Sequence, residues 1–120
     1  MAKVSVTPVT RGEIYLVKFD PTVGSEIKKT RPAIIIQNDT ANQFSPVTIV
    51  AAITSKFNDK LYPTEVLLRA GEAGLKHDSV VAFDQIRTID KMRLVKRLGQ
   101  VSTFTMKRAD TALKISVGLI

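Results

Sequence analysis

Apolar residues fall into short blocks along most of the chain, and polar segments that contain Pro, Gly or Asn separate these blocks. The blocks are rich in β-branched and aromatic side chains, which favours strands over helices. The predicted strands lie at residues 12–19, 33–36, 47–54, 64–69 and 79–83. Residues 57–63 and the glycine-containing residues 70–76 are predicted connections between them.

The end of the chain has a helical period instead. Ser102 or Thr103 can cap a helix, because a hydroxyl side chain accepts a hydrogen bond from the free backbone amides of the first turn. The apolar positions that follow recur at steps of three or four residues: Met106, Ala109, Leu113, Val117 and Ile120. This spacing predicts a C-terminal amphipathic helix.

Four other segments have weaker patterns. Residues 40–44 favour a helical turn, and residues 84–90 either continue the preceding strand or bend it. Residues 91–101 are compatible with a last strand or with a short helix. Residues 20–30 contain Pro, Gly, Ser and four charged side chains without periodicity. That composition predicts a long loop, and a long loop in a small domain often carries function.

Several short strands followed by one helix fit a small, strongly bent β-barrel capped by the helix, which is a β-rich α+β fold. A chain of 120 residues is long enough for one hydrophobic core and too short for two. We expect one domain over residues 11–120, preceded by a loose leader at residues 1–10 whose pattern demands no fixed structure.

Composition narrows the possible chemistry. The chain has no Cys and a single His, His77, which excludes thiol catalysis, disulfides, cysteine-ligated zinc and a two-His catalytic pair. We interpret His77 as a plain surface residue and expect no metal site and no cofactor. The sequence contains no apolar run of roughly 18 residues and no apolar signal-peptide core, so we expect a cytoplasmic protein.

The charge balance points to anionic partners. Lys and Arg number 18 against 11 Asp and Glu, which gives a net charge of +7 and a pI near 9.9. Long-range attraction makes nucleic acid the first candidate partner. Net charge argues only for association, so a specific site still has to be identified.

Arg31 is the first candidate for such a site. Pro32 fixes its own backbone and pushes Arg31 toward extended geometry, which places Arg31 at the mouth of a predicted strand. A guanidinium held there can make two parallel hydrogen bonds to a phosphate. The alternative is a surface Arg that solubilises a strand end. Thr54 and Ser55 stand at the end of another apolar block. They are either a second edge of the site or ordinary hydroxyl side chains at the end of a strand.

Several motifs together carry a family resemblance. They are RGEIY at residues 11–15, PTVGSE at 21–26, TRPAIIIQND at 30–39, FSP at 44–46, IVAAIT at 49–54, DSVV at 78–81, QIRTIDK at 85–91 and ALKIS at 112–116. In this order they make the chain resemble the MazF/PemK/Kid toxins, which are mRNA interferases, and most of all the EndoA-type MazF branch. The likeness covers essentially residues 11–120.

The resemblance implies an SH3-like barrel, a homodimer, and metal-free, sequence-specific cleavage of single-stranded RNA that stops translation and growth. It also implies inhibition by a cognate acidic, MazE-like antitoxin. In this family Arg31 and Thr54 correspond to the catalytic pair. Gly24, Ser25 and Glu26, together with Gln85 and Arg87, correspond to positions that flank the RNA.

Metal-free RNA cleavage uses the 2'-hydroxyl as the internal nucleophile, so the enzyme must move protons and stabilise charge on the phosphate. Arg31 suits the electrostatic task, because a guanidinium rarely gives up its proton. Thr54 can add a neutral hydrogen bond. Glu26 is the candidate proton acceptor, provided that its loop folds over the site. Lys28 and Lys29 depart from the small residues that relatives often have there, and predict stronger, more salt-sensitive RNA binding.

Other interpretations stay open on the residues alone. Arg87 could pair with Asp84 or Asp90, and the aromatic side chains of Tyr15, Phe19 and Phe44 could stack on bases or fill the core. A CcdB-type gyrase poison shares the expected fold but does not cleave RNA, and a simple single-strand-binding barrel would keep the charge without cleavage. The recognised bases cannot be read from the sequence; the branch suggests a UACAU-like pentad.

Overall fold

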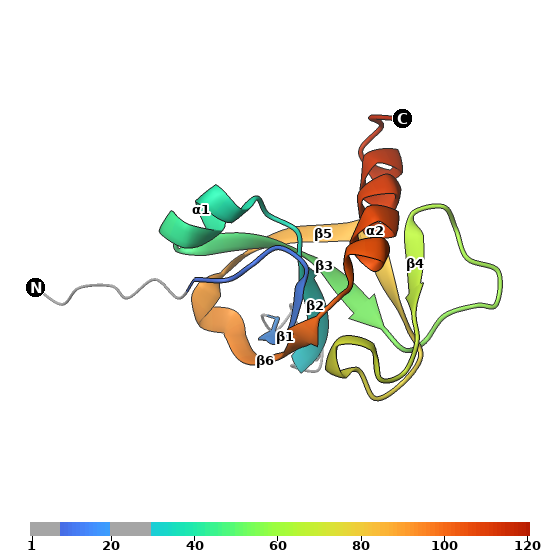
Figure 1. The fold of residues 1–120 in the computed structure, drawn as a ribbon, viewed down its shortest axis with the longest axis horizontal. Coiled ribbons are helices and arrows are strands. Elements are labelled where there is room, and N and C mark those ends of the chain that lie inside the picture. The colour runs from blue at the N-terminus through green and yellow to red at the C-terminus, as the bar shows by residue number, and fades with distance from the viewer. Residues whose placement is uncertain (1–7, 20–29) are drawn as a thin grey trace, which may run out of the picture.

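The computed structural model describes residues 8–19 and 30–120. Figure 1 shows a curled sheet with one long helix against it and a short helix at its other end. The elements are β1 (Glu13–Lys18), β2 (Thr30–Ile35), α1 (Asp39–Phe44), β3 (Val47–Thr54), β4 (Glu65–Leu68), η1 (Glu72–Gly74), β5 (Ser79–Asp90), η2 (Lys91–Arg93), β6 (Leu94–Gln100) and α2 (Thr103–Ser116).

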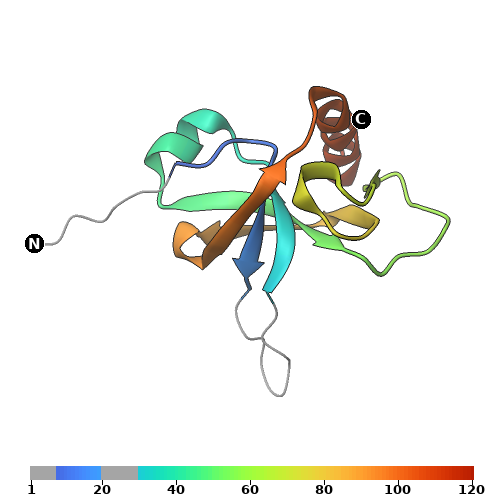
Figure 2. The same ribbon diagram turned by 60° about the horizontal axis from the view of Figure 1, so that its bottom comes forward.

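The strands form one antiparallel sheet in the order β4-β5-β3-β2-β1-β6. The sheet curls strongly, so that β1 and β6 come round toward the far end of β5 (Figure 2). This arrangement confirms the predicted small, bent barrel with a C-terminal helix. Each predicted strand is found, and the predicted helical turn at residues 40–44 lies within α1.

The bend is concentrated in β5. This strand includes residues 84–90, the segment that was predicted either to continue the preceding strand or to bend it. Its second half continues the pairing with β3, but Ala51 pairs with Ile86 while the adjacent Ala52 pairs with Ala82. Three extra residues on β5 therefore make a bulge, and a bulge increases the local twist. The strand both continues the sheet and bends it. Residues 91–101 resolve as the short helix η2 followed by the strand β6.

The two faces of the sheet carry separate apolar clusters. The outer cluster packs under α2 and contains, among others, Ile34, Ala51, Ile53, Val81, Phe83, Ala109 and Ala112. The inner cluster fills the concave side of the curl with Val9, Val17, Ala33, Ile35, Val50 and Ile89. Consecutive residues of β2 and β3 alternate between the clusters, as the period of a strand requires.

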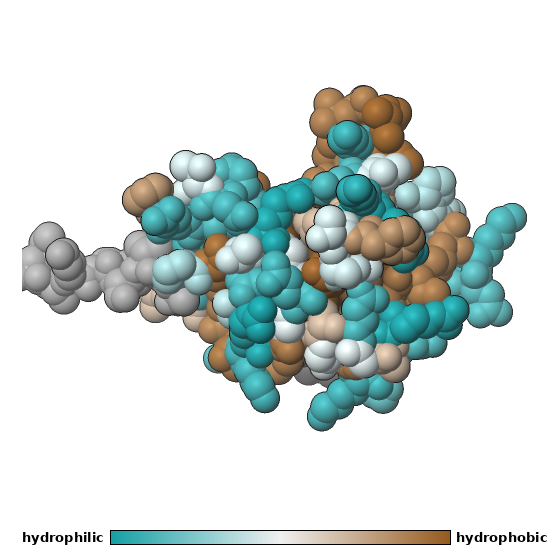
Figure 3. Space-filling view, in the orientation of Figure 1, coloured by the Kyte–Doolittle hydropathy of each residue, from teal (hydrophilic) through white to brown (hydrophobic). Residues whose placement is uncertain are grey.

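The C-terminal prediction needs one correction. Ser102 caps α2 by accepting a hydrogen bond from the Thr105 amide, but the helix ends at Ser116, and Val117 and Ile120 are 55% and 70% exposed. Gly118, at φ 79°, turns the chain after the helix end, and the Gly118 and Leu119 amides donate to the Ile115 and Lys114 carbonyls. This Schellman motif ends the helix at Ser116, before the predicted apolar stripe reaches its last two residues. Apolar side chains gather at this tip in Figure 3.

The packed part of the chain begins before Arg11. Val9 is 5% exposed within the inner cluster, and the Thr10 amide donates to Glu13 Oε1 at 2.5 Å. Residues 1–7, the greater part of the predicted leader, lie outside the described residues. So does most of the predicted long loop, including Gly24, Ser25, Glu26, Lys28 and Lys29.

Candidate functional site

Arg31 is the second residue of β2, where the sheet reaches the long loop. It lies opposite Val17 of β1, and its side chain is exposed. Pro32, the next residue, lies opposite Leu16, in the extended geometry that its ring favours. Among the described residues, no hydrogen bond or ion pair engages the Arg31 guanidinium. The sheet thus presents a free cation at its end.

Thr54 is the last residue of β3, and its hydroxyl is held by the chain that follows. Thr54 Oγ1 accepts a hydrogen bond from the Lys56 amide at 3.1 Å and donates to the Lys56 carbonyl at 3.4 Å. A Thr hydroxyl often makes such a local turn where a strand stops. The side chain is half-buried, so this hydroxyl has a fixed position while one side of it stays open to solvent.

The register of β2 against β3 brings these two residues together. Ile35 pairs with Val50, Ile34 with Ala51, and Ala33 with Ala52. The paired ladder ends there; continued by two residues, the same register would set Arg31 opposite Thr54. Residues two apart on a strand point to the same face, so Arg31 shares the face of Ala33 and Ile35, inside the curl, and Thr54 shares the face of Val50 and Ala52. The two candidate catalytic residues therefore lie on the same face, at the adjoining ends of β2 and β3.

Arg87 reaches the same concave face from β5, where it pairs with Val50. Its guanidinium carbon lies 5.0 Å from the centre of the Phe19 ring, a cation–π distance. Among the described residues Arg87 makes no ion pair with Asp84 or Asp90, and Asp90 instead accepts a hydrogen bond from the Met92 amide. The ion-pair alternative for Arg87 is therefore wrong within the described chain.

The contact between Arg87 and Phe19 crosses the inside of the curl. Arg87 lies on β5 and Phe19 directly follows β1, and these two strands are separated in the sheet by β3 and β2, so nothing in the local sequence pattern pairs the two residues. Phe19 and Tyr15 pack against the inner cluster, whereas Phe44 is 71% exposed. Two of the three candidate stacking aromatics are thus partly used by the core.

Gln85 precedes Arg87 by two residues and is exposed. Ile86, between them, packs against the outer cluster, and Gln85 is one of the three bulged residues of β5 that have no partner on β3, so strand pairing does not place Gln85 on the face of Arg87. The remaining predicted RNA-binding residues, Gly24, Ser25, Lys28 and Lys29, and the predicted proton acceptor Glu26 fall outside the described part of the chain. Their roles stay predictions.

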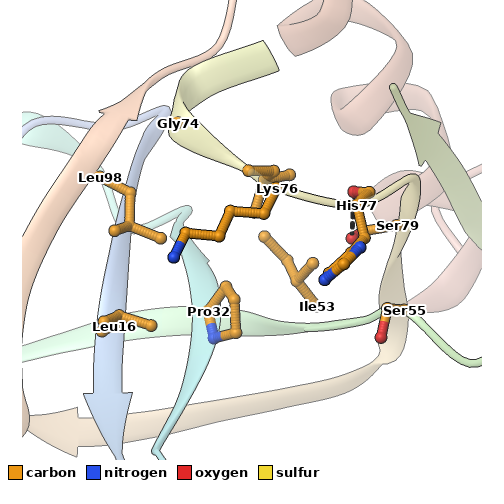
Figure 4. Close-up of a pocket in the computed structure, with 10 residues that line it drawn as sticks. Leu16, Pro32, Ile53, Ser55, Gly74, Lys76, His77, Ser79 and Leu98 are labelled. Atoms are coloured by element: carbon orange, nitrogen blue, oxygen red, sulfur yellow. Dashed lines mark hydrogen bonds between the residues drawn. The ribbon is translucent and has the colours of Figure 1, made fainter. Parts of the chain in front are cut away.

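Two hollows open on either side of Ser55, and the sequence did not reveal either. The first, of about 310 Å³, is mainly apolar and lies on the opposite face from Arg31. It is lined by Leu16, Pro32, Ile53, Ser55, Gly74, Leu75, Lys76, His77, Ser79 and Leu98. Lys76 extends across this pocket toward Leu98, and His77 lies beside Ser79 (Figure 4). His77 is exposed, as predicted, but it contributes to this pocket wall.

The wall formed by η1 depends on close backbone packing against β6. A Cβ on Gly99 would lie 2.6 Å from the Ala73 carbonyl carbon, and one on Gly74 would lie 2.3 Å from the Leu98 carbonyl oxygen. Neither position has room for a side chain, so the glycines allow η1 to lie directly on the strand. The predicted glycine-containing connection therefore builds one side of the apolar pocket.

The second hollow, of about 530 Å³, is mainly polar and lies along the connection between β3 and β4. Its lining residues are Ser55, Lys56, Phe57, Asn58, Lys60, Tyr62 and Glu65. Over residues 8–19 and 30–120, no group of three or more His, Asp or Glu side chains could hold a metal ion. No helix in this part of the chain is long and apolar enough to cross a membrane.

Comparison with known proteins gives one consistent result. A family model for the PemK-like, MazF-like toxin of type II toxin-antitoxin systems matches residues 10–117. Endoribonuclease EndoA of Bacillus subtilis (strain 168) is 45% identical over 112 residues, which are 93% of this chain and 97% of EndoA.

Solved structures match over nearly the whole chain as well. A mycobacterial endoribonuclease in complex with its cognate antitoxin has a TM-score of 0.75 at 25% identity, covering 93% of this chain and 97% of that one. The MazE-MazF complex (Form-II) of Deinococcus radiodurans has a TM-score of 0.78 at 23% identity, covering 95% and 99%, and shows the shared fold. The fold and the family model together confirm the predicted resemblance: the chain belongs to the PemK-like, MazF-like toxins of type II toxin-antitoxin systems.

Proposed function

We propose that the chain is the toxin of a type II toxin-antitoxin pair and an endoribonuclease that cleaves single-stranded RNA at specific sequences. Cleavage of mRNA in the cytoplasm would not require the ribosome, and it would inhibit translation and growth. The observation that supports this proposal is the β2–β3 register, which leaves Arg31 and Thr54 on the same face at the adjoining ends of the two strands, in a chain 45% identical to an endoribonuclease.

Arg31 stabilises the phosphate in the proposed reaction. Attack of the 2'-hydroxyl on the adjacent phosphorus crowds the phosphate and increases the negative charge on its oxygens. The step forms a 2',3'-cyclic phosphate and breaks the bond from phosphorus to the 5'-oxygen of the next nucleotide, which leaves as a hydroxyl after taking a proton from water. A guanidinium fixed at the strand end lowers the barrier by lying where this charge develops. Within residues 8–19 and 30–120, no ion pair of Arg31 has to break before RNA binds.

Thr54 and Glu26 complete the proposed catalytic group. The Thr54 hydroxyl can donate a hydrogen bond to a phosphate oxygen when it releases the Lys56 carbonyl, which it meets at the long distance of 3.4 Å. Glu26 is assigned the proton of the 2'-hydroxyl, since a carboxylate is a suitable base and the Arg31 guanidinium is not. This reaction needs no metal ion.

The proposed RNA-binding residues surround this pair. Arg87 lies on the concave face of β5, where its guanidinium, stacked on Phe19, can contact a base or a phosphate, and Gln85 is the exposed residue two positions before it. Gly24, Ser25, Lys28 and Lys29 are assigned to the loop that joins β1 to β2. Its two lysines add positive charge beside Arg31 in the sequence.

Two protein partners belong to the proposal. The first is a second copy of the chain, as a homodimer, and the second is an acidic MazE-like antitoxin that neutralises the toxin. The net charge of +7 favours an acidic inhibitor, and relatives have been solved in complex with MazE or a cognate antitoxin.

One assay tests the proposal. Purified protein is incubated with a long unstructured RNA in EDTA, and the new RNA ends are mapped. We expect cuts at one short sequence, their loss in Arg31→Ala, and at least tenfold slower cleavage with unchanged RNA binding in Glu26→Gln. Intact RNA would contradict the proposal and favour a gyrase poison or a simple RNA-binding barrel. A wild-type rate in Glu26→Gln would remove only Glu26 from the mechanism.

A further inference from the structure

The polar hollow beside Ser55 has the composition of a single-strand binding surface. The connection between β3 and β4 stands away from the sheet as a wide loop (Figure 1), and two lysines, Lys56 and Lys60, line the hollow together with Phe57 and Tyr62. The Tyr62 ring is 70% exposed, so it contributes little to the core. Proteins that bind single strands combine basic side chains with exposed aromatic rings in this way, because every base has a face that can stack.

The backbone of this loop is anchored although its side chains are free. The Tyr62 amide donates to Glu65 Oε1 at 2.8 Å, and the Tyr62 carbonyl accepts from the Glu65 amide at 2.9 Å. The Glu65 carboxylate, the single acidic group in the lining, is therefore engaged with the backbone. These two bonds fix where the Tyr62 ring leaves the loop, which lowers the conformational entropy lost when a base stacks on it.

The other end of the hollow is joined to the catalytic pair. Ser55 lies in its wall directly after Thr54, and the Thr54 hydroxyl is bonded to the amide and the carbonyl of Lys56, the next lining residue. An RNA strand whose phosphate lies at Arg31 and Thr54 must leave the site on one side or the other. On the Thr54 side, Ser55 and Lys56 follow directly and line the hollow.

We propose that the hollow is an RNA subsite for nucleotides flanking the cleaved bond, in which a base stacks on Tyr62 and phosphates lie against Lys56 and Lys60. This inference rests on the proposed RNA cleavage. An acidic protein segment could also contact the lysines, but the continuity with Thr54 and the exposed ring favour the RNA strand. The subsite adds affinity outside the recognised bases, since stacking and phosphate contacts are tolerant of sequence.

The test compares kcat/KM for cleavage of one long RNA oligonucleotide and two short ones in EDTA. The long one carries several unpaired nucleotides on both sides of the mapped cut, and short ones are truncated on either side. On the long RNA, Tyr62→Ala should lower kcat/KM about 5- to 100-fold while Tyr62→Phe keeps it near wild type. Lys56→Gln with Lys60→Gln should reduce the slope of log affinity against log salt by about 1.4. One of the truncated RNAs should show neither effect.

Matched controls lie on α2, away from the hollow. Phe104 is 72% exposed, and Lys107 and Lys114 are exposed on the same helix. Phe104→Ala and the double change Lys107→Gln, Lys114→Gln should leave both quantities unchanged. Thermal denaturation of each variant checks that it is folded before its kinetics are compared.

The outcomes separate this inference from the proposed function. If the parent chain fails to cut RNA, the proposed function fails and the subsite fails with it. If the parent cuts and the Tyr62 and Lys56/Lys60 variants behave like the α2 controls, the subsite alone is wrong. If these variants weaken binding of a poly-glutamate peptide but leave RNA cleavage unchanged, the hollow serves an acidic protein segment, and the proposal is again wrong.

Discussion

Thr54 illustrates at the residue scale how a small polar side chain is held at a strand end. Its hydroxyl satisfies both the amide and the carbonyl of Lys56, so it stabilises the turn that leaves β3 while it stays half-exposed. The same side chain therefore has a structural role and a proposed chemical one. Replacements that separate the hydroxyl from the shape of the side chain distinguish the two roles.

Thr54→Ser should retain most of the cleavage rate, because the hydroxyl is kept, whereas Thr54→Val, which matches the shape, should cleave at least about tenfold more slowly. The loss of one hydrogen bond to Lys56 should also lower the free energy of unfolding of Thr54→Val by about 0.5–1.5 kcal/mol. Single-turnover cleavage at saturating enzyme gives the rate, and urea unfolding gives the stability. A wild-type rate in Thr54→Val would leave Thr54 with the structural role alone.

Which residues could be found from sequence depends on how local their signal is. Arg31 and Thr54 stand at the ends of apolar blocks, so a one-dimensional pattern marks both. Arg87 and Phe19 touch only because the sheet curls, and the hollows beside Ser55 depend on how two connections fold back. These features have no local signature, since curvature and loop path are set by long-range packing.

At the scale of elements, α1 is held by a buried polar network rather than by an apolar face. Asn42 is fully buried and donates to the Gln37 carbonyl at 2.8 Å, while its Oδ1 accepts from Gln37 Nε2 at 3.0 Å and from Thr48 Oγ1 at 2.8 Å. The buried ammonium of Lys91 donates to the Asn42 carbonyl. Burial lowers the pKa of Lys91 from its usual 10.5, which is consistent with the cost of desolvating this charge.

This network assigns a structural role to parts of the sequence that supported the family resemblance. The network includes Gln37 of the TRPAIIIQND motif and Lys91 of the QIRTIDK motif, together with Thr48, which directly precedes IVAAIT. Here these residues hold a short helix against the end of the sheet. The pattern predicted the helical turn but not its attachment, because polar residues in a loop segment ordinarily face water. A motif shared with enzymes can therefore contain fold residues next to catalytic ones.

Asn42→Ala should lower the free energy of unfolding by about 2–5 kcal/mol, because it leaves several buried polar groups of Gln37 and Thr48 without a partner. Gln43→Ala, at the exposed neighbouring position of α1, should change it by less than about 0.5 kcal/mol. Urea unfolding with a common m-value measures both. Equal effects of the two substitutions would show that the network contributes no net stability.

At the scale of the whole molecule, Arg11 joins three parts of the fold. Its amide donates to Asp39 Oδ1 at 2.7 Å, its Nε donates to the Ile36 carbonyl at 2.9 Å, and its Nη2 lies 2.5 Å from Asp110 Oδ1 on α2. The chain before β1, the end of β2 with α1, and the C-terminal helix are thus connected by one side chain. Arg11 opens the RGEIY motif, so this residue of the motif has a structural role.

The ion pair between Arg11 and Asp110 should contribute measurably to stability, since its side chains are only 27% and 40% exposed. A double-mutant cycle of Arg11→Met and Asp110→Asn should give a coupling energy of about 1 kcal/mol, with Arg11→Met alone costing more because it also loses the bond to Ile36. The pair Arg69–Asp78 is the matched control: it is 3.5 Å apart with side chains 76% and 48% exposed, and its coupling should be near zero. Thermal unfolding of both cycles at low salt measures the difference. If the two coupling energies are equal, the Arg11–Asp110 ion pair does not hold α2 to the sheet, and Arg11 contributes only through its bonds to Ile36 and Asp39.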